Sequence, residues 1–183
     1  MVLDVATGMG TFLAPLLERC SADASIIGTD IDEKPLRGLM NKTEKPGLIK
    51  LSLMVADAKH LCFQNTVFFT VSSFFGFDNV PETALAFKQV SRVLQDDGRV
   101  FFTSLWYEAG SESMRLAEKR GIAQVASEAR LKKALDRSGL FLTVLKKRIL
   151  EFGLIIRWTC YPSMETSIGM LSCMPTSPNT EDS

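Results

Sequence analysis

The sequence lacks an excess of either charge. Its 183 residues include 21 Lys and Arg and 21 Asp and Glu, so the formal net charge is zero. A nucleic-acid-binding protein usually carries a basic excess that neutralises phosphates, and the balance therefore argues against a nucleic-acid partner. No apolar run approaches the roughly 20 residues that span a bilayer, and no secretory signal precedes the first strand. We expect a soluble, cytoplasmic protein with no membrane span, and composition predicts no oligomeric state.

Residues that ligate metals are also sparse. His60 is the single histidine, and no C-x-x-C pair is present. Zinc sites need more closely spaced ligands, so no metal is predicted. We interpret His60 as a surface residue and the cysteines as small buried residues in a reducing compartment. The cysteines are Cys20, Cys62, Cys160 and Cys173.

The chain does contain alternating strand and helix patterns, which predict right-handed β-α-β units. Strands are expected at residues 1–5, 25–30, 49–55, 67–75, 99–104 and 141–150, and helices after Gly10, at 33–41, from Pro81 onwards and at 127–137. A seventh strand is placed at 167–174, with 154–160 as the alternative. The predicted fold is α/β, a Rossmann-like, doubly wound, mainly parallel seven-stranded sheet with helices on both faces. One domain is expected at 1–174, followed by a disordered tail at 175–183.

Two glycines, Gly8 and Gly10, follow the first strand. Glycine there permits positive φ and lets a ligand approach without meeting a Cβ atom. The helix N-terminus beyond the turn offers free N–H groups to an anion. An ordinary strand-to-helix turn fits the two glycines equally well, so they indicate a ligand only in combination with other residues.

Asp30 supplies that combination, since it ends the second expected strand. An ionised carboxylate at this place can accept hydrogen bonds from both hydroxyls of a ribose. The alternative is that Asp30 or Asp32 caps the next helix. We favour a nucleoside ligand, because an acidic residue at this turn is what a nucleoside site needs.

The residues around the glycines help to distinguish a dinucleotide such as NAD(P) from a nucleoside that carries an amino acid. A dinucleotide site needs a third glycine for close helix–strand packing, and Leu13 stands at that position. Asp4 precedes the turn, where it would repel a pyrophosphate and attract an ammonium group. S-adenosylmethionine (SAM) carries such a group. SAM is therefore preferred to NAD(P), and a dinucleotide-binding oxidoreductase remains the third alternative.

Four segments, in the same order along the chain, resemble motifs of the class I SAM-dependent methyltransferases, and the subgroup with the ubiquinone and menaquinone methyltransferases is the most similar. They are VLDVATGMG at 2–10, IGTDID at 27–32, VADAKHLCF at 55–63 and the helix and strand at 85–100. Four motifs in order are far more specific than any one. The resemblance covers roughly residues 1–104.

The resemblance implies a cofactor, SAM, and a set of contacts with it. These are Asp4, Ala6, Gly8 and Gly10 at the methionine end, Asp30 at the ribose, Ile31, Asp57 and Ala58 at the adenine, and Ser73 beside the sulfonium. Asp57 has the alternative role of a turn residue.

Three features depart from the family pattern. Phe69 stands where an Asp is expected, and Asp78-Asn79 replaces a frequent His-His pair. Strand one begins at Met1, so the helical segment that covers the cofactor in family members is expected to be missing. Residues 107–124 have no place in the sheet and could cover the cleft instead, but we expect the cleft to stay open.

Methyl transfer needs a base only when the acceptor holds a proton. Asp78 is the catalytic candidate, since it follows strand four. The resemblance implies a SAM-dependent methyltransferase acting on a small-molecule acceptor. The alternative is a truncated or degenerate SAM-binding module without activity.

Overall fold

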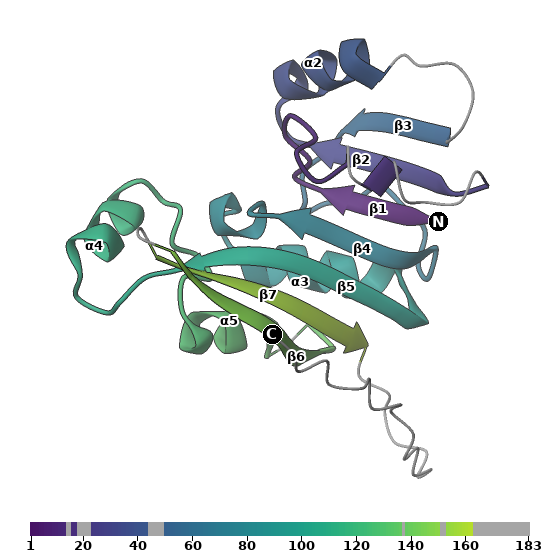
Figure 1. Ribbon diagram of the computed structural model, residues 1–183. Coiled ribbons are helices and arrows are strands. Elements are labelled where there is room, and N and C mark those ends of the chain that lie inside the picture. The colour runs from purple at the N-terminus through teal and green to yellow at the C-terminus, as the bar shows by residue number, and fades with distance from the viewer. Residues whose placement is uncertain (14–15, 18–22, 44–49, 137, 151–152, 163–183) are drawn as a thin grey trace, which may run out of the picture.

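The computed structural model describes residues 1–13, 16–17, 23–43, 50–136, 138–150 and 153–162. Within these residues one sheet has the strand order β3-β2-β1-β4-β5-β7-β6 (Figure 1). Its strands are β1 Val2–Val5, β2 Ser25–Asp30, β3 Lys50–Val55, β4 Phe68–Phe74, β5 Leu94–Trp106, β6 Leu140–Leu150 and β7 Gly153–Pro162. The helices are α2 Glu33–Thr43, the 3-10 turn η1 Phe77–Asn79, α3 Thr83–Val93, α4 Glu112–Lys119 and α5 Glu128–Leu135.

Five strands form a parallel unit, β3-β2-β1-β4-β5. The chain moves outward from β1 to β2 and β3, and then returns to the other side of β1 to form β4 and β5. The strand order therefore reverses between β1 and β4. In sheets of this kind ligands bind beyond the carboxyl ends of the strands at that reversal. The prediction of a Rossmann-like α/β fold is confirmed.

Both faces of the parallel unit are covered. Successive strand residues point to opposite faces, and neighbours in β1 indeed enter different apolar clusters. Val2 packs with Ile26 and with Leu39 of α2. Leu3 belongs to a second cluster that contains Phe87 of α3. The helices α2 and α3 thus lie on opposite faces of the sheet, as right-handed crossovers in opposite directions require.

The end of the sheet lies where one of the two positions considered for a seventh strand was placed. The strand that completes it is β7, Gly153–Pro162, which lies antiparallel between β5 and β6. β7 therefore coincides with the alternative position at 154–160. Two partners determine this choice, because β7 forms ladders with both neighbours along most of its length. Residues 167–174 and the tail at 175–183 lie outside the described residues.

Among the described strands, β6 ends the sheet on this side, and its pairing is irregular. Its pairing with β7 shifts register between Val144 and Lys146, so that Leu145 is an extra residue on the β6 side. A bulge of this kind bends a strand and increases its twist.

Three local features also differ from expectation. The stretch 107–124 contains the helix α4, which is capped by Ser111, whose hydroxyl accepts the Met114 N–H. Helix α3 begins at Thr83 instead of Pro81, and Glu82 before it adopts a left-handed conformation. Strand β5 begins at Leu94 instead of residue 99, because Leu94 already pairs with Phe68. The start of β5 is thus decided by a contact distant in sequence, which a local pattern does not reveal.

Two further observations concern the described residues as a set. None of their helices combines the length and apolar character needed to cross a membrane. None of their His, Cys, Asp and Glu side chains form a group of three that could hold a metal ion. Cys62 is exposed, so the interpretation of the cysteines as buried residues is wrong for this one.

Arg92 of α3 anchors the loop between β3 and β4. Its guanidinium donates to the carbonyl oxygens of Leu61 and Phe63, 2.6 and 2.7 Å away, and to Asn65 Oδ1 at 3.0 Å. Gln89 Oε1 on the same helix also accepts from it. One side chain thus fixes a loop that has no secondary structure of its own.

Replacing Arg92 should therefore destabilise the fold. Hydrogen bonds to charged groups contribute about 1.5–3 kcal/mol each and are not additive, so we expect Arg92→Ala to lower the free energy of unfolding by roughly 2–4 kcal/mol. Lys88→Ala, on the same helix but exposed, should change it by less than about 0.5 kcal/mol. Urea denaturation of both variants measures the difference. Equal effects of the two substitutions would contradict the anchoring role.

Candidate functional site

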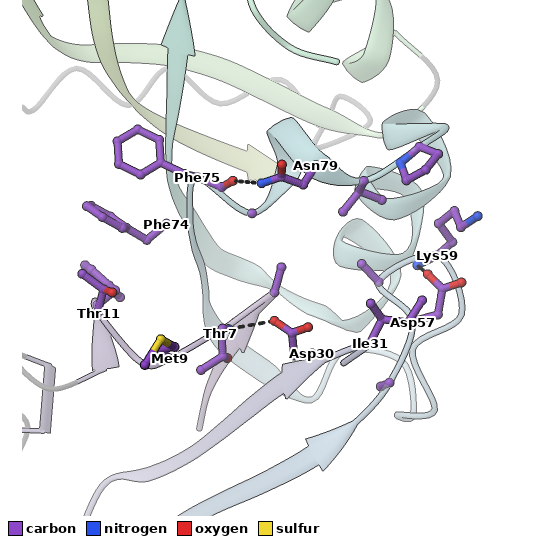
Figure 2. Close-up of a pocket in the computed structure, with 18 residues that line it drawn as sticks. Thr7, Met9, Thr11, Asp30, Ile31, Asp57, Lys59, Phe74, Phe75 and Asn79 are labelled. Carbon is purple, nitrogen blue, oxygen red and sulfur yellow. Dashed lines mark hydrogen bonds between the residues drawn. The ribbon is translucent and has the colours of Figure 1, made fainter. Parts of the chain in front are cut away.

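A cavity of about 460 Å³ lies at the carboxyl ends of the strands, at the reversal of strand order. Its walls come from the turn after β1, the ends of β2 and β3, and the loop after β4. Figure 2 shows Phe74 and Phe75 toward one end, Asp57 and Lys59 toward the other, and Asp30 between them. The cavity therefore has an aromatic end and a charged end.

The turn after β1 presents its backbone to the cavity. Ala6 and Gly8 have φ values of 54° and 55°, in the left-handed region. A Cβ atom on Gly8 would meet nothing within 4 Å, so the backbone there is open. Ala6 is not a glycine, and the left-handed conformation costs such a residue about 1–3 kcal/mol. The fold therefore holds a strained turn at the cavity.

Gly10 has a different role from Gly8. Its φ is 78°, and a Cβ atom built on it would overlap the Leu39 side chain of α2. Gly10 does not line the cavity. It allows the turn to pack against α2, whereas Gly8 leaves room for a ligand.

Asp30 connects two turns at the carboxyl edge of the sheet. Its Oδ2 accepts the Gly8 N–H at 2.7 Å, and its Oδ1 accepts the Asp32 N–H at 3.0 Å. A carboxylate has about four lone-pair sites, so both oxygens keep acceptor capacity toward the cavity. The side chain of Ile31, which is 70% exposed, lines the same region. A carboxylate with spare acceptors beside an exposed apolar side chain suits a nucleoside.

Asp57 and Ala58 form the charged end with Lys59. The Asp57 carboxylate accepts the Lys59 N–H at 2.8 Å, and this bond is the main reason that its pKa is lowered. His60 Nδ1 lies 3.6 Å from the second Asp57 oxygen, and the His60 side chain is 77% exposed. The Lys59 ammonium lies 3.5 Å from the Glu82 carboxylate, so it links this loop to the start of α3.

The loop after β4 forms the aromatic end. The Phe12 and Phe74 rings are nearly parallel, with centroids 6.1 Å apart, and the Phe74 and Phe75 centroids are 4.5 Å apart. Phe75 has a φ of 55°, so the loop after β4, like the turn after β1, contains a strained residue that is not glycine. Asn79 lines the cavity nearby, and its side-chain amide donates to the Phe75 carbonyl.

Two predicted residues lie beneath the cavity. Asp4 is buried and accepts a 2.6 Å hydrogen bond from the Ser72 hydroxyl, and burial raises its pKa to about 6. The Ser73 hydroxyl is buried and finds no hydrogen-bond partner among the described residues. A Cβ atom on Gly76 would overlap both Ser73 Oγ and the Ala6 Cβ atom. The Ser73 hydroxyl therefore lies where the turn after β1 meets the loop after β4.

A family model described as "Methyltransferase domain" matches residues 2–98, which is more than half of the chain. The chain belongs to the class I SAM-dependent methyltransferase family. Over 100 residues this methyltransferase domain is 32% identical to the ubiquinone/menaquinone biosynthesis C-methyltransferase UbiE of Idiomarina loihiensis. The match covers 54% of this chain and 40% of that protein, so the chain spans less than half the length of this curated relative.

Solved structures share the fold of this methyltransferase domain. The YcgJ protein from Bacillus subtilis superposes with a TM-score of 0.77 at 12% identity, over 89% of this chain and 92% of that one. A Haemonchus contortus phosphoethanolamine N-methyltransferase superposes with a TM-score of 0.75 at 13% identity, over 89% and 48%. At such identities the likeness is one of fold alone.

The methyltransferase domain brings six of the nine predicted cofactor residues to the cavity. They are Ala6, Gly8, Asp30, Ile31, Asp57 and Ala58. Asp4, Gly10 and Ser73 lie outside the lining, and the roles of all nine remain predictions. The catalytic candidate Asp78 also lies outside the lining, while its neighbour Asn79 lies within it.

Sequence reasoning missed the aromatic wall and Asn79. The aromatic residues around strand four were visible as a cluster, but their pattern indicated only a strand. Phe69, the departure from the family pattern, is 43% exposed on β4 and does not line the cavity. Residues 107–124 do not line it either; Met114 and Ala117 of this stretch pack with Ala123 and Ala126.

Gly76 offers a test of the close approach of the walls. Gly76→Ala should destabilise the fold by about 1–3 kcal/mol, because an added methyl group overfills a packed site. The matched control is Gly38→Ala in α2, where a Cβ atom would meet nothing within 4 Å. Alanine there should stabilise the fold by about 0.5–1 kcal/mol. Opposite signs in urea denaturation are expected, and a neutral Gly76→Ala would show that the walls are less closely packed.

Proposed function

We propose that this domain binds SAM and transfers its methyl group to a small-molecule acceptor. The observation that carries the proposal is the position of Asp30 at the reversal of strand order. Its carboxylate is held by the Gly8 and Asp32 N–H groups and retains acceptor capacity toward the cavity. A ribose presents two neighbouring hydroxyl donors to such a group.

The remaining residues fit SAM. Ile31 would pack on the adenine, and Asp57 would accept from the adenine amino group. The methionine end would lie over the Gly8 turn, above Asp4. The Ser73 hydroxyl is buried and has no hydrogen-bond partner among the described residues, which costs free energy. We place this hydroxyl beside the sulfonium.

Packing beneath the turn argues against a dinucleotide. Leu13 is fully buried, and it approaches the point where Gly28 of β2 would carry a Cβ atom, at 3.1 Å. The small residue at this helix–strand contact is thus on the strand, and not on the helix as in dinucleotide-binding turns. The Asp4 carboxylate would also repel a pyrophosphate when ionised.

Bound SAM supplies a methyl group that the sulfonium already activates. The residues of this chain would then orient the reactants and exclude water, which can provide much of the rate. Asp30, Asp57 and Lys59 are the charged side chains among the lining residues, and Figure 2 shows Asp57 and Lys59 away from Phe74 and Phe75. An aromatic end of this kind favours a small organic acceptor and disfavours a phosphate backbone.

The second candidate is a SAM-binding module without methyl transfer. It is favoured by the absence, among the described residues that line the aromatic end, of a side chain that could act as a base. An acceptor that ionises by itself needs no base, however, so both candidates remain compatible with the site. Turnover of SAM to S-adenosylhomocysteine with a panel of small acceptors separates them.

Calorimetry with free ligands tests the choice of cofactor. S-adenosylhomocysteine and SAM should bind, because the cavity offers a carboxylate for the ribose and an open turn for the methionine end. NAD and NADP should not bind, because the Asp4 carboxylate would repel a pyrophosphate when ionised and Leu13 stands where a dinucleotide site needs a glycine. Binding of NADP without a SAM signal would reject the proposed function.

The carboxylate at position 30 can be tested in the same assay. Asp30→Ala should weaken S-adenosylhomocysteine roughly tenfold or more, since charge-assisted hydrogen bonds contribute about 1.5–3 kcal/mol each. Asp32→Ala is the matched control, because Asp32 is exposed and accepts the Lys34 N–H outside the cavity. Both variants should first be shown to be folded at the assay temperature, since Asp30 also holds the turn. Equal affinities of the two would assign Asp30 a purely structural role.

A further inference from the structure

Asp78 lies behind the wall of the cavity and not inside it. It is the middle residue of η1, between Phe77, which is fully buried, and Asn79, which lines the cavity. The Asp78 side chain is itself only 4% exposed. A base that accepts a proton from a ligand must reach that ligand, so this placement disfavours Asp78 as the catalytic base.

The Asp78 carboxyl group contacts the end of β5. Ser104 Oγ lies 2.7 Å from Asp78 Oδ1, and the Leu105 N–H donates to Oδ2 over 3.4 Å. Ser104 Oγ also lies 3.2 Å from the carbonyl oxygen of Val125, in the segment that precedes α5. The hydroxyl of Ser104 therefore has two acceptors in reach, and it carries a single hydrogen.

That single hydrogen makes the protonation state of Asp78 consequential. A neutral Asp78 donates from Oδ1 to Ser104 Oγ, which leaves the Ser104 hydrogen free for the Val125 carbonyl, while Oδ2 still accepts from Leu105. This chain joins η1, β5 and residue 125. An ionised Asp78 takes the Ser104 hydrogen for itself, and the Val125 carbonyl loses this donor.

The surroundings of Asp78 also favour the neutral form. None of the ion pairs of the described residues includes Asp78. Burial raises its pKa to about 7. The pKa of Tyr107, which follows β5, is raised by burial and then by the charge of ionised Asp78, so Tyr107 offers Asp78 no positive partner. On α3, which also packs against η1, Lys88 is exposed and Arg92 binds the 61–65 loop.

We propose that Asp78 is a positioning residue that works as a neutral acid, holding the cavity wall at η1 to β5 and to residue 125. Asn79, which follows Asp78, and Gly76, two residues before it, line the cavity, so this anchor sets the shape of the wall. The effect on ligand binding rests on the proposed function, whereas the effect on the fold does not.

The variant Asp78→Asn reproduces the neutral acid group by group. Its amide N–H can donate to Ser104 Oγ, and its amide oxygen can accept the Leu105 N–H. Ser104→Ala removes the middle of the chain. Ser138→Ala is the matched control, because Ser138 is also buried and donates to a carbonyl, that of Leu135, away from Asp78.

The first measurement is urea unfolding of wild type and Asp78→Asn between pH 4 and pH 9. A carboxyl group whose pKa is raised on folding stabilises the fold below its unfolded pKa, and this stabilisation is lost as the pH rises through about 7. The unfolding constant of wild type relative to Asp78→Asn should therefore rise by up to tenfold per pH unit between about pH 4 and 7 and then level off. Asp4 titrates alike in both proteins and cancels. A flat ratio would overturn the proposal.

The second measurement is S-adenosylhomocysteine affinity at pH 6.0 and pH 8.5. Wild type should lose affinity at the higher pH relative to Asp78→Asn, Ser104→Ala should bind more weakly than Ser138→Ala, and Asp78→Asn should bind as wild type does at pH 6.0. Identical pH ratios for wild type and Asp78→Asn would overturn the positioning of the wall. If no protein binds at either pH, the proposed function fails, and the unfolding profile still decides the protonation of Asp78.

Discussion

The hydrogen bond from the Gly8 N–H to the Asp30 carboxylate is the interaction on which the cavity depends. It connects the turn after β1 to the end of β2 across 2.7 Å, and it holds a backbone in which Ala6 and Gly8 are both left-handed. Strain in a turn persists only where the surrounding structure over-determines it. Asp30 is thus a structural group and a candidate ligand group at once.

The opposite wall is held differently, by three consecutive residues of β5. The Phe75 N–H donates to the Thr103 hydroxyl, and Ser104 and Leu105 contact the Asp78 carboxyl group. The contact between Ser104 and Asp78 is buried, and the other two are partly buried. In a low-dielectric interior polar networks stabilise strongly when satisfied and cost much when they are not. One wall therefore depends on the charge of Asp30, and the other on polar groups that are buried or partly buried.

The parts of this molecule that the sequence predicted are those in which one local pattern decides the outcome. Asp30 could be placed because an acidic residue ends a strand of β-branched residues. Gly10 could not be separated from Gly8, because its role depends on Leu39, far along the chain in α2. Asn79 lines the cavity because of the turn η1, in which Phe77 is buried in the core and Asn79 faces the cavity, and a strand pattern does not reveal such a turn. The seventh strand depends on its partners, β5 and β6, which local composition does not reveal.

The irregular outermost strand has a consequence for contact between copies of the chain. An edge strand offers unpaired N–H and C=O groups on which a further strand can add, and proteins counter this with bulges and with basic residues. β6 has both, since the extra residue Leu145 is followed directly by Lys146, Lys147 and Arg148. A second chain that paired with this edge would have to follow a bent strand. Among the strands that the structure describes, the bulge therefore makes the β6 edge a poor template for the addition of a further strand.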